Sequence, residues 1–440
     1  MIEISARDLF EKNNRFDLIY KILYLENINN SNCGYYKKLY LDSIEVFNNF
    51  KEDNKISAND FEDAFYKNYF SMLEKGFDKN YPIPINSNFQ LYDGAHRLAI
   101  AYTLGINVVC DIVEHSDVFD YAFFKKRKIS SNLADIGALE YVLHNEHAHI
   151  VQVFPIANKK NDIYIESILN KHGFVYYKKE ININYNALIK IKQINYGKES
   201  WAGDKNNDYN GLKEHARECL ALGKMRVYIF VCENISDAVN AKKEIRNLIQ
   251  CGNFPIHIND DHNEAVRLAN IYFNKNALDW LNSAPYNIST NQMEYENEFL
   301  NYCNHHNINQ NYICMSGSSV LSLYGLRTAV DIDCIATNGI AIVEEGNISS
   351  HNSEMKYYPL SFDNLIIMHE NYLVIDGIKY VSLNNIIKFK FNRMEMFKDV
   401  KDLYLMCIKK NWKKIMMNIS TVCIYIPWAV LHRIRKRLHC

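Results

Sequence analysis

The most chemically suggestive part of the sequence is the stretch SGSSVLSLYGLRTAVDID, which ends at Asp333. Its Gly317-Ser318 pair is followed, after residues 319–330, by Asp331 and Asp333, with one isoleucine between them. Alternate acids on a strand project from the same face, where two carboxylates can hold one or two Mg²⁺ or Mn²⁺ ions. Small residues at a helix start offer amides and hydroxyls to phosphates. The stretch therefore predicts a metal and nucleotide-phosphate site, and a solvated strand edge is the alternative.

These residues resemble the signature of the polymerase-β-type nucleotidyltransferase superfamily, in which a hydrophobic residue and a Gly-Ser pair precede two acids on a strand. The resemblance implies a nucleotidyltransferase-like domain with a nucleotide as substrate. It implies that Asp331 and Asp333 ligate the metal and act in catalysis, and that Gly317 and Ser318 contact the triphosphate, with a catalytic part for Ser318. Arg327, four residues before Asp331, matches an arginine often found there and is expected to join the catalytic set.

A downstream stretch, RMEMFKDVKDL, is similar to the C-terminal helix of antitoxin-like and small sugar- or antibiotic-modifying nucleotidyltransferases. Lys398, Asp399 and Asp402 fall on that layout. Lys388 or Lys390, just before it, is expected to reach a phosphate.

A third catalytic acid is less clearly marked. Superfamily members with polymerase-like chemistry place one on a later strand, and Asp376, in the sequence LVIDG, is the nearest candidate. An Asp-Gly pair is also typical of a hairpin turn. The general base and full two-metal catalysis therefore stay open, with a non-catalytic version of the domain as an alternative.

A second candidate site lies at Asp93-Gly94-Ala95-His96-Arg97, between the strand-like FQLY and the helix-like RLAIAYTLG. A glycine at a strand-to-helix turn lets backbone amides approach a ligand, and an adjacent arginine supplies a two-pronged phosphate donor. Asp93 is expected to orient Arg97 or to hold a cation, and His96 to donate to a phosphate oxygen. A plain Asp-Gly turn, with Arg97 paired to Asp93, is the alternative.

This stretch resembles the phosphate-binding box of the ParB/sulfiredoxin superfamily, whose D-G-x-H-R signature cradles nucleotide phosphates at a helix N-terminus. The resemblance implies a nucleotide- or phosphate-binding site formed by Asp93, Gly94, His96 and Arg97, and TLGINVVCDIVE matches the usual continuation into a strand. Ala95 stands where the redox members carry cysteine, and the helix-turn-helix of partition proteins is missing. Phosphate binding is therefore expected rather than redox chemistry or DNA partition.

Three smaller groups of residues favour structural roles. In HINDDHNE, Asp260 or Asp261 is expected to cap a helix, with a metal or substrate site as the alternative. The histidines of HNEHAHI do not match the HExxH spacing, so a solvated loop is expected. Trp201 lies in a predicted loop, as a substrate platform or as a core anchor.

The composition indicates a folded protein without a bulk nucleic-acid interface. Of 440 residues, 48% are hydrophobic and 23% charged, and the net charge is -1, so no nucleic-acid partner is expected. The 11 cysteines contain no CxxC spacing, which favours free thiols in a reducing compartment over zinc modules or disulfides. Neither a signal-like segment nor the roughly 18 apolar residues of a spanning helix is found, so a cytoplasmic location is expected.

The C-terminal segment, TVCIYIPWAVLHRIRKRLHC, joins an apolar run to a basic end. A final core helix with a charged tail is one interpretation. A peripheral contact with an anionic membrane, at the inner face of that membrane, is the other, because apolar and polybasic elements act together on such surfaces.

The elements that must position these residues fall into three blocks with a tail. Residues 1–130 begin with helix-like segments at 6–25, 40–50 and 60–75 and continue through the strand YPIPI into the unit that carries Gly94. Residues 135–285 alternate strands (HIVQVFP, FVYYKKEINI, MRVYIFVCE, FPIHIN) with helices (IESILNKHG, SDAVNAKKEIRNLIQ). Residues 290–415 add the strands IAIVEE and YLVIDGIKYVSL and a C-terminal helix, and residues 416–440 form an apolar-basic tail.

The expected fold class is therefore α/β (α+β) and multidomain. The resemblances assign a ParB/sulfiredoxin-like N-terminal domain, an α/β middle domain and a nucleotidyltransferase-like C-terminal domain to the three blocks.

The combination of blocks resembles proteins of bacterial surface-polysaccharide (capsule) gene clusters, through SSVLSLYGLRTAVDIDCIA, SHNSEMKYYPLSFDNLI and IHINDDHNEAVRLA. The expected function is a Mg²⁺-dependent transferase that moves a nucleotidyl or phosphoryl-type group to or from a sugar or polyol. One alternative is a ParB/sulfiredoxin-like small-molecule kinase with a non-catalytic C-terminal domain. The other is a nucleotide-sensing or toxin–antitoxin-type regulator.

Overall fold

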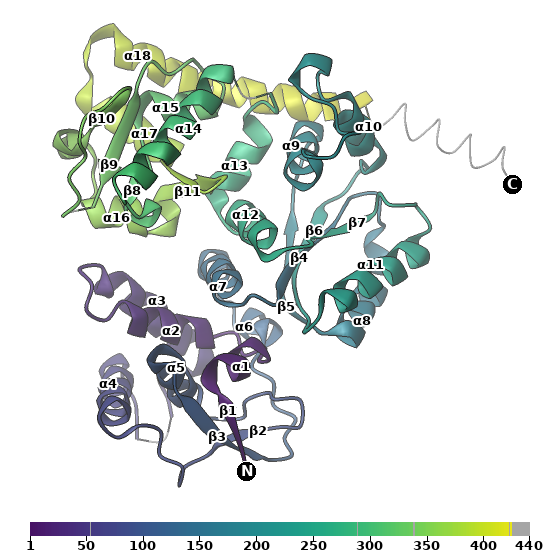
Figure 1. Cartoon of the computed structure of the whole chain (residues 1–440), viewed down its shortest axis with the longest axis vertical. Coiled ribbons are helices and arrows are strands. Elements are labelled where there is room, and N and C mark those ends of the chain that lie inside the picture. Colours follow the sequence, from purple (N-terminus) through teal and green to yellow (C-terminus); the bar gives the residue numbers. More distant parts are fainter. Residues whose placement is uncertain (53, 288, 338, 422, 425–440) are drawn as a thin grey trace, which may run out of the picture. The chain divides into compact units, whose positions relative to one another are not determined.

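The computed structural model describes residues 1–52, 54–287, 289–337, 339–421 and 423–424. The chain is mixed α/β, as predicted, with helices packed around sheets of three, four and five strands (Figure 1). Its residues group into two compact units by their contacts. Unit 1 comprises residues 1–149, 169–178 and 228–238, and unit 2 comprises residues 150–168, 179–227 and 239–440.

Unit 1 holds a three-stranded sheet with the order β1-β3-β2. β1 (Ile2–Ser5) is antiparallel to β3 (Asn107–Ile112), and β2 (Ile83–Ile85) is parallel to β3. α5 packs with α1, α2 and α4 and leads directly into β3, which is the turn-helix-strand order expected from the sequence. The first helices of the chain are α1 (Ala6–Glu11), α2 (Leu18–Glu26), α3 (Cys33–Asn48), α4 (Ala58–Lys75), α5 (Ala95–Leu104), α6 (Tyr121–Lys126) and α7 (Ser131–His144).

A four-stranded sheet has the order β5-β6-β4-β7. Its strands are β4 (Ala148–Val153), β5 (Phe174–Ile181), β6 (Met225–Val231) and β7 (Ile256–Ile258), which confirms the four strands predicted for this part of the sequence. β4 pairs antiparallel with β7. All residues of β4, β6 and β7 are buried, which explains the nearly continuous apolar run MRVYIFV.

The five-stranded sheet of unit 2 has the order β10-β9-β8-β12-β11. Its strands are β8 (Ile313–Met315), β9 (Ile332–Ala336), β10 (Ile348–Ser350), β11 (Tyr372–Ile375) and β12 (Ile378–Val381). β9 is antiparallel to β8 and parallel to β10, and Met315 lies opposite Cys334. The residues that leave β8 therefore lie beside the residues that begin β9, which brings Gly317 close to Asp333.

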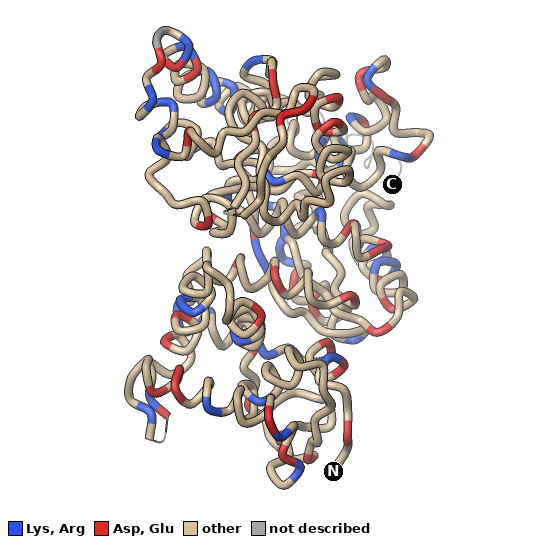
Figure 2. The backbone as a smooth tube through the Cα atoms, turned by 60° about the vertical axis from the view of Figure 1, so that its left-hand side comes forward, with Lys and Arg blue, Asp and Glu red and all other residues tan. Residues whose placement is uncertain are grey.

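The remaining helices alternate with these strands or cover the sheets (Figure 1). They are α8 (Asp162–His172), α9 (Tyr185–Tyr196), α10 (Asn210–Glu218), α11 (Ile235–Ile249), α12 (His262–Tyr272), α13 (Lys275–Ser283), α14 (Thr290–His305), α15 (Gly317–Leu323), α16 (Phe362–Ile367), α17 (Leu383–Arg393) and α18 (Met396–Tyr404). Acidic and basic residues are interspersed along most of the chain, in keeping with the net charge of -1 (Figure 2).

Two helices predicted as continuous are each broken into two. The segment 6–25 is interrupted between α1 and α2, where the Asn13 carboxamide accepts from the Arg15 N–H and donates to the Phe89 carbonyl. Such side-chain bonds compete with the helical ladder. The predicted C-terminal helix is interrupted at Met394, which adopts a left-handed φ of 44°. There the Asp399 carboxylate accepts from the Glu395 N–H at 2.7 Å.

Two further local predictions are wrong in part. The segment IAIVEE, at residues 340–345, forms no strand, because the Val343 N–H donates to the Tyr302 hydroxyl; the strand is β10, a few residues later. The segment HNEHAHI is not all solvated loop, because His149 is buried within β4. Only Glu146 and His147 of this segment are exposed.

The predicted boundary near residues 130–135 falls at the start of α7, inside unit 1. Most of the tail predicted at residues 416–440 lies outside the described residues, so the interpretation of its basic end is taken from the sequence alone. In the part of the chain that the structure describes, every helix is too short or too polar to cross a membrane.

Candidate functional site

The two aspartates of the first motif converge on Ser318. The Ser318 hydroxyl donates to Asp331 Oδ1 at 3.0 Å, and the Ser318 backbone N–H donates to the Asp333 carboxylate. Asp331 lies just before β9 and is partly exposed, whereas Asp333 lies on β9 and is buried. The backbones of these two segments are also hydrogen-bonded, because the Ser316 N–H donates to the Asp333 carbonyl at 2.7 Å.

Gly317 makes this approach possible. It has a φ of +54°, and a side chain on it would place Cβ only 1.9 Å from Asp333 Oδ2. A residue with a Cβ would therefore clash with the carboxylate in a backbone conformation that already disfavours it. The Gly-Ser pair and the two acids form one structural unit.

Two residues of the neighbouring strand region complete the surroundings of Asp333. The His351 Nε2 lies 2.9 Å from Asp333 Oδ1, and the Ser349 hydroxyl donates to the same oxygen at 3.4 Å. Burial acts to raise the pKa of Asp333, but the His351 contacts outweigh it and lower the pKa below its ordinary value. The other ring nitrogen of His351, Nδ1, is buried without a hydrogen-bond partner among the described residues.

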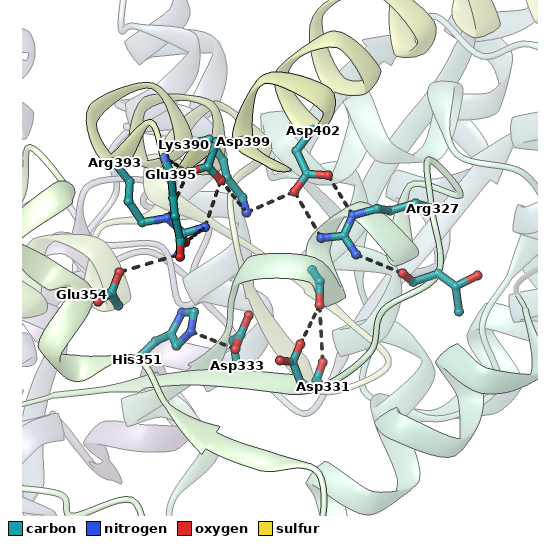
Figure 3. Close-up of polar contacts among 12 residues, drawn as sticks. Arg327, Asp331, Asp333, His351, Glu354, Lys390, Arg393, Glu395, Asp399 and Asp402 are labelled. Atoms are coloured by element: carbon teal, nitrogen blue, oxygen red, sulfur yellow. Dashed lines mark hydrogen bonds and ion pairs between the residues drawn. The ribbon is translucent and has the colours of Figure 1, made fainter. Parts of the chain in front are cut away.

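Arg327 belongs to a buried ion network beside the acids (Figure 3). Its guanidinium makes a two-pronged contact with the Asp402 carboxylate, at 2.8 and 3.1 Å. Lys390 Nζ lies 3.0 Å from Asp402 and 3.1 Å from Asp399, and Arg393 contacts Asp399 at 2.9 Å. This two-pronged, charge-assisted contact makes Arg327 an anchor for α18.

The two acids of the RMEMFKDVKDL stretch, Asp399 and Asp402, are both part of this network. Asp399 and Asp402 are almost completely buried, and so is Lys390, which was expected to reach a phosphate. Arg393 and Lys390 together hold the pKa of Asp399 at about 2, against the opposing effect of burial. Lys388 is exposed, as is Lys398, so these two lysines remain accessible to solvent.

Asp376 lies away from the acid pair. It forms the turn between β11 and β12 with a φ of 49°, as the Asp-Gly pair predicts. Tyr380 of β12 is opposite Met315 of β8, so Asp376 is about 13 Å back along the strand direction. Among the described residues, the strand beside Asp333 carries Ser349 instead of a third acid.

The acid pair offers the oxygen ligands that a divalent cation such as Mg²⁺ prefers. The described residues contain no group of three or more His, Cys, Asp or Glu side chains arranged as a metal site. Mg²⁺, however, is commonly held by one or two carboxylates together with substrate phosphates and water. Asp331 has one carboxylate oxygen engaged by Ser318, while its Oδ2 has no hydrogen-bond partner among the described residues. The carboxylate and hydroxyl donors therefore fit a hard cation that shares its ligands with a phosphate.

The second motif lies in unit 1, at the start of α5. Gly94 is the N-cap residue, with a left-handed φ of 85°, and no side chain caps the helix there. The Arg97 guanidinium donates to the Tyr81 and Pro82 carbonyls and lies 3.8 Å from the exposed Asp93 carboxylate. The Asp93–Arg97 pairing considered from the sequence is therefore present.

His96 points to an aromatic group. Its Nε2 lies 3.1 Å from the Tyr40 hydroxyl, and its ring packs edge-on against Phe65 with centroids 4.8 Å apart. Burial lowers the pKa of His96 well below its ordinary value. With the imidazole neutral and engaged, and the Arg97 guanidinium bound by the Tyr81 and Pro82 carbonyls, the helix-start amides are the groups of this motif that could meet a phosphate.

The smaller clusters have structural roles. Asp261 caps α12 by accepting from the Glu264 N–H at 2.8 Å, which confirms the predicted cap. Glu264 in turn binds His257 at 2.8 Å, in a buried pair. Trp201 is stacked on His215 and lines a pocket of about 590 Å³ in unit 2, so it is both packed and partly exposed.

No family model, curated protein or solved structure matches this chain.

Sequence reasoning missed His351 and Ser349. Ser349 lies in β10 and His351 directly follows it, whereas the pattern placed this strand at IAIVEE, a few residues too early. The signal that could have found them is the expectation that a later strand places a third group beside the two acids. With the strand correctly located, Ser349 is opposite Asp333 in the register.

Proposed function

We propose that this chain is a Mg²⁺-dependent transferase that moves a nucleotidyl or phosphoryl-type group between a nucleotide-activated donor and a sugar or polyol. In this proposal residues 290–415 form a nucleotidyltransferase-like domain, and residues 1–130 form a ParB/sulfiredoxin-like phosphate-binding domain. The resemblance to proteins of bacterial surface-polysaccharide clusters favours a sugar or polyol acceptor.

The observation that carries the proposal is the convergence of Asp331 and Asp333 on the Gly317-Ser318 turn. A strand-end turn of small residues and two carboxylates is the combination that a metal-bound polyphosphate requires. The alternative of a solvated strand edge is disfavoured, because Asp333 is 6% exposed and its carboxylate is held by three groups of the chain.

Each residue then has a defined part. Asp331 and Asp333 would hold the cation, which supplies charge neutralisation at the reacting phosphorus. Ser318 holds Asp331 through its hydroxyl, and Gly317 leaves room for the Asp333 carboxylate. Arg327 acts as a positioning residue, because its guanidinium is bound to Asp402 and fixes the segment that leads into Asp331.

The first test is nucleotide binding by the full chain. We expect nucleoside triphosphates with Mg²⁺ to raise the Tm, because a ligand that binds only the folded state stabilises it. Asp331→Asn should lose the Mg²⁺-dependent part of this increase. Asp117→Asn, at an exposed acid in unit 1, is the matched control and should behave as wild type.

The second test is turnover with a panel of nucleoside triphosphates and of sugar or polyol acceptors. Release of pyrophosphate indicates nucleotidyl transfer, and release of a nucleoside diphosphate indicates phosphoryl transfer. Asp331→Asn should reduce either activity by at least about a hundredfold, since metal stabilisation amounts to several kcal/mol. Unchanged turnover in Asp331→Asn, with activity abolished by Arg97→Ala, would instead assign the chemistry to the N-terminal motif.

A further inference from the structure

The last described helix of the chain has an unusual orientation. α18 continues through a π-helical turn (Leu405–Lys409) into helical residues 410–421, and Figure 1 draws this stretch as one long yellow helix. From Phe397 to Ile419 it extends over about 33 Å. It therefore offers a long, continuous face.

The solvent-facing side of this helix is largely apolar, with Lys398 and Lys401 also exposed near its start. Phe397 is 89% exposed and Trp412 is 63% exposed. The exposed apolar residues recur every three or four positions, which places them on one face. They are Phe397, Val400, Tyr404, Ile408, Trp412, Ile415, Met416 and Ile419, here called the apolar face.

The helix packs on the rest of unit 2 mainly through polar groups, although its Met406 is also buried. Lys410 and Lys414 bind the two carboxylate oxygens of Asp279 on α13. These lysine contacts outweigh the effect of burial and lower the pKa of Asp279. Lys413 donates to the Gly325 carbonyl at 3.0 Å, and Thr421 accepts from the Tyr185 N–H at 2.8 Å.

This arrangement is the reverse of an ordinary surface helix, which buries its apolar stripe and exposes its polar side. Ionic and hydrogen-bonded contacts hold the helix to the rest of unit 2, and the apolar face stays in solvent. A contiguous row of exposed apolar side chains along a helix marks a contact surface for a partner or a membrane.

The charge of the segment indicates the kind of partner. From Phe397 to the end of the chain the sequence contains 10 Lys and Arg residues and only two acids, Asp399 and Asp402. Both acids are buried in the ion network. Beyond Asp402 the sequence has no acid, and the four last basic residues follow a second apolar run.

We propose that the apolar face lies on an anionic membrane surface, with the exposed Lys398 and Lys401 at the lipid phosphates. Apolar side chains inserted at the headgroup boundary and basic residues near it act together, and either alone binds weakly. Trp412 and Tyr404 are residue types favoured at this boundary. A second copy of the chain fits less well, because two such faces would bring strongly basic segments together.

The test is sedimentation of the full chain with vesicles of phosphatidylcholine alone or of phosphatidylcholine mixed with phosphatidylglycerol. Wild type should bind the anionic vesicles and lose binding when NaCl is raised from about 0.1 M to about 1 M. Ile408→Gln with Trp412→Gln should weaken binding at least about tenfold, through lost apolar insertion. Ile163→Gln with Tyr164→Gln, at two exposed apolar positions of α8, is the matched control and should bind as wild type.

Three results would overturn the proposal. The first is an absence of wild-type binding to anionic vesicles. The second is binding that the Ile408/Trp412 variant does not weaken. The third is a concentration-dependent dimer in light scattering that the same variant abolishes, which would assign the apolar face to a second copy. Because these readouts need no nucleotide, they are independent of the proposed transferase activity.

Discussion

At the scale of single residues, Gly317 links the backbone to the acid pair. The Asp333 carboxylate occupies the position where a side chain at residue 317 would be, and the left-handed φ of Gly317 adds to the need for glycine. Any residue larger than glycine at position 317 would therefore displace the Asp333 carboxylate.

We expect Gly317→Ala to lower the free energy of unfolding by about 2 to 4 kcal/mol, from left-handed strain and from the clash with Asp333. It should also abolish the Mg²⁺-dependent nucleotide effect. Urea unfolding and the Tm measurement provide the two readouts.

Gly34→Ala is the matched control for this substitution. Gly34 lies in α3, and an added Cβ would meet no atom within 4 Å. Because alanine favours helix, this variant should be unchanged or more stable by up to about 1 kcal/mol. A loss of stability equal to that of Gly317→Ala would contradict the assigned clash.

At the scale of elements, two groups of ion pairs connect helices within a unit. In unit 2, Asp402 of α18 joins Arg327, in the segment before β9, to Lys390 of α17. The acid pair of the candidate site is held in place by this connection, because Arg327 precedes Asp331 in the chain by only four residues.

Asp402→Asn should destabilise the protein by about 3 to 5 kcal/mol, since Arg327 loses its buried counter-charge and Lys390 keeps Asp399 alone. Denaturant unfolding measures this loss. Asp260→Asn removes a surface ion pair with Lys242 and should have little effect. Equal effects of the two variants would show that burial of the network contributes nothing.

In unit 1, His144 at the end of α7 binds Glu26 at the end of α2, with the two groups 3.1 Å apart. Burial acts to lower the pKa of His144, but the hydrogen bond and charge of Glu26 outweigh it and raise the pKa to about 9. A raised pKa in the folded state stabilises the protein fully below the unfolded value of about 6.5. This contribution is lost as the pH rises through about 9.

We therefore expect the stability advantage of wild type over His144→Gln to fall by about 1 to 2 kcal/mol between pH 6 and pH 10, allowing for the partial exposure of Glu26. Urea unfolding across this pH range measures the difference. An advantage that stays constant, or that grows with pH, would exclude the ion pair as its cause.

At the scale of the whole molecule, the accessibility of the cysteine thiols to solvent measures how well the cores are packed. The ten described cysteines are free thiols. Only Cys407 and Cys423 are exposed, and Cys33 and Cys251 are intermediate. The other six are buried, and burial raises the pKa of the Cys110 and Cys303 thiols to about 11.

In a Cys440→Ser background, which removes the thiol outside the described residues, a disulfide reagent should modify two thiols rapidly and two more slowly. Six should react only after unfolding, because thiolate formation and access are both suppressed by burial. Rapid modification of more than four thiols in the native protein would contradict the packing of these cores.

Local patterns in the sequence were sufficient for much of the fold. The apolar runs of β4, β6 and β7, the Asp261 cap of α12 and the Asp-Gly turn at Asp376 depend on residues close together in the chain. The same holds for the spacing that paired Gly317 with Asp333. Period and turn chemistry act over a few residues, so they are visible without tertiary structure.

Other features depended on contacts between residues far apart in the sequence. Residues 340–343 are apolar and strand-like, yet the Tyr302 hydroxyl accepts from the Val343 N–H and the strand forms later, at β10. His351 was not recognised because its role arises from the register between β10 and β9. The buried positions of Arg327 and Lys390 depend on acids 75 and 12 residues later.

The sequence by itself therefore determined the alternation of helices and strands and the pairing of a Gly-Ser turn with two acids. Only the tertiary structure decided the partners of those acids, the structural use of Arg327 and Lys390, and the outward orientation of the apolar face. The physical reason is that periodicity tells which residues share a face, whereas burial and charge pairing decide what that face meets.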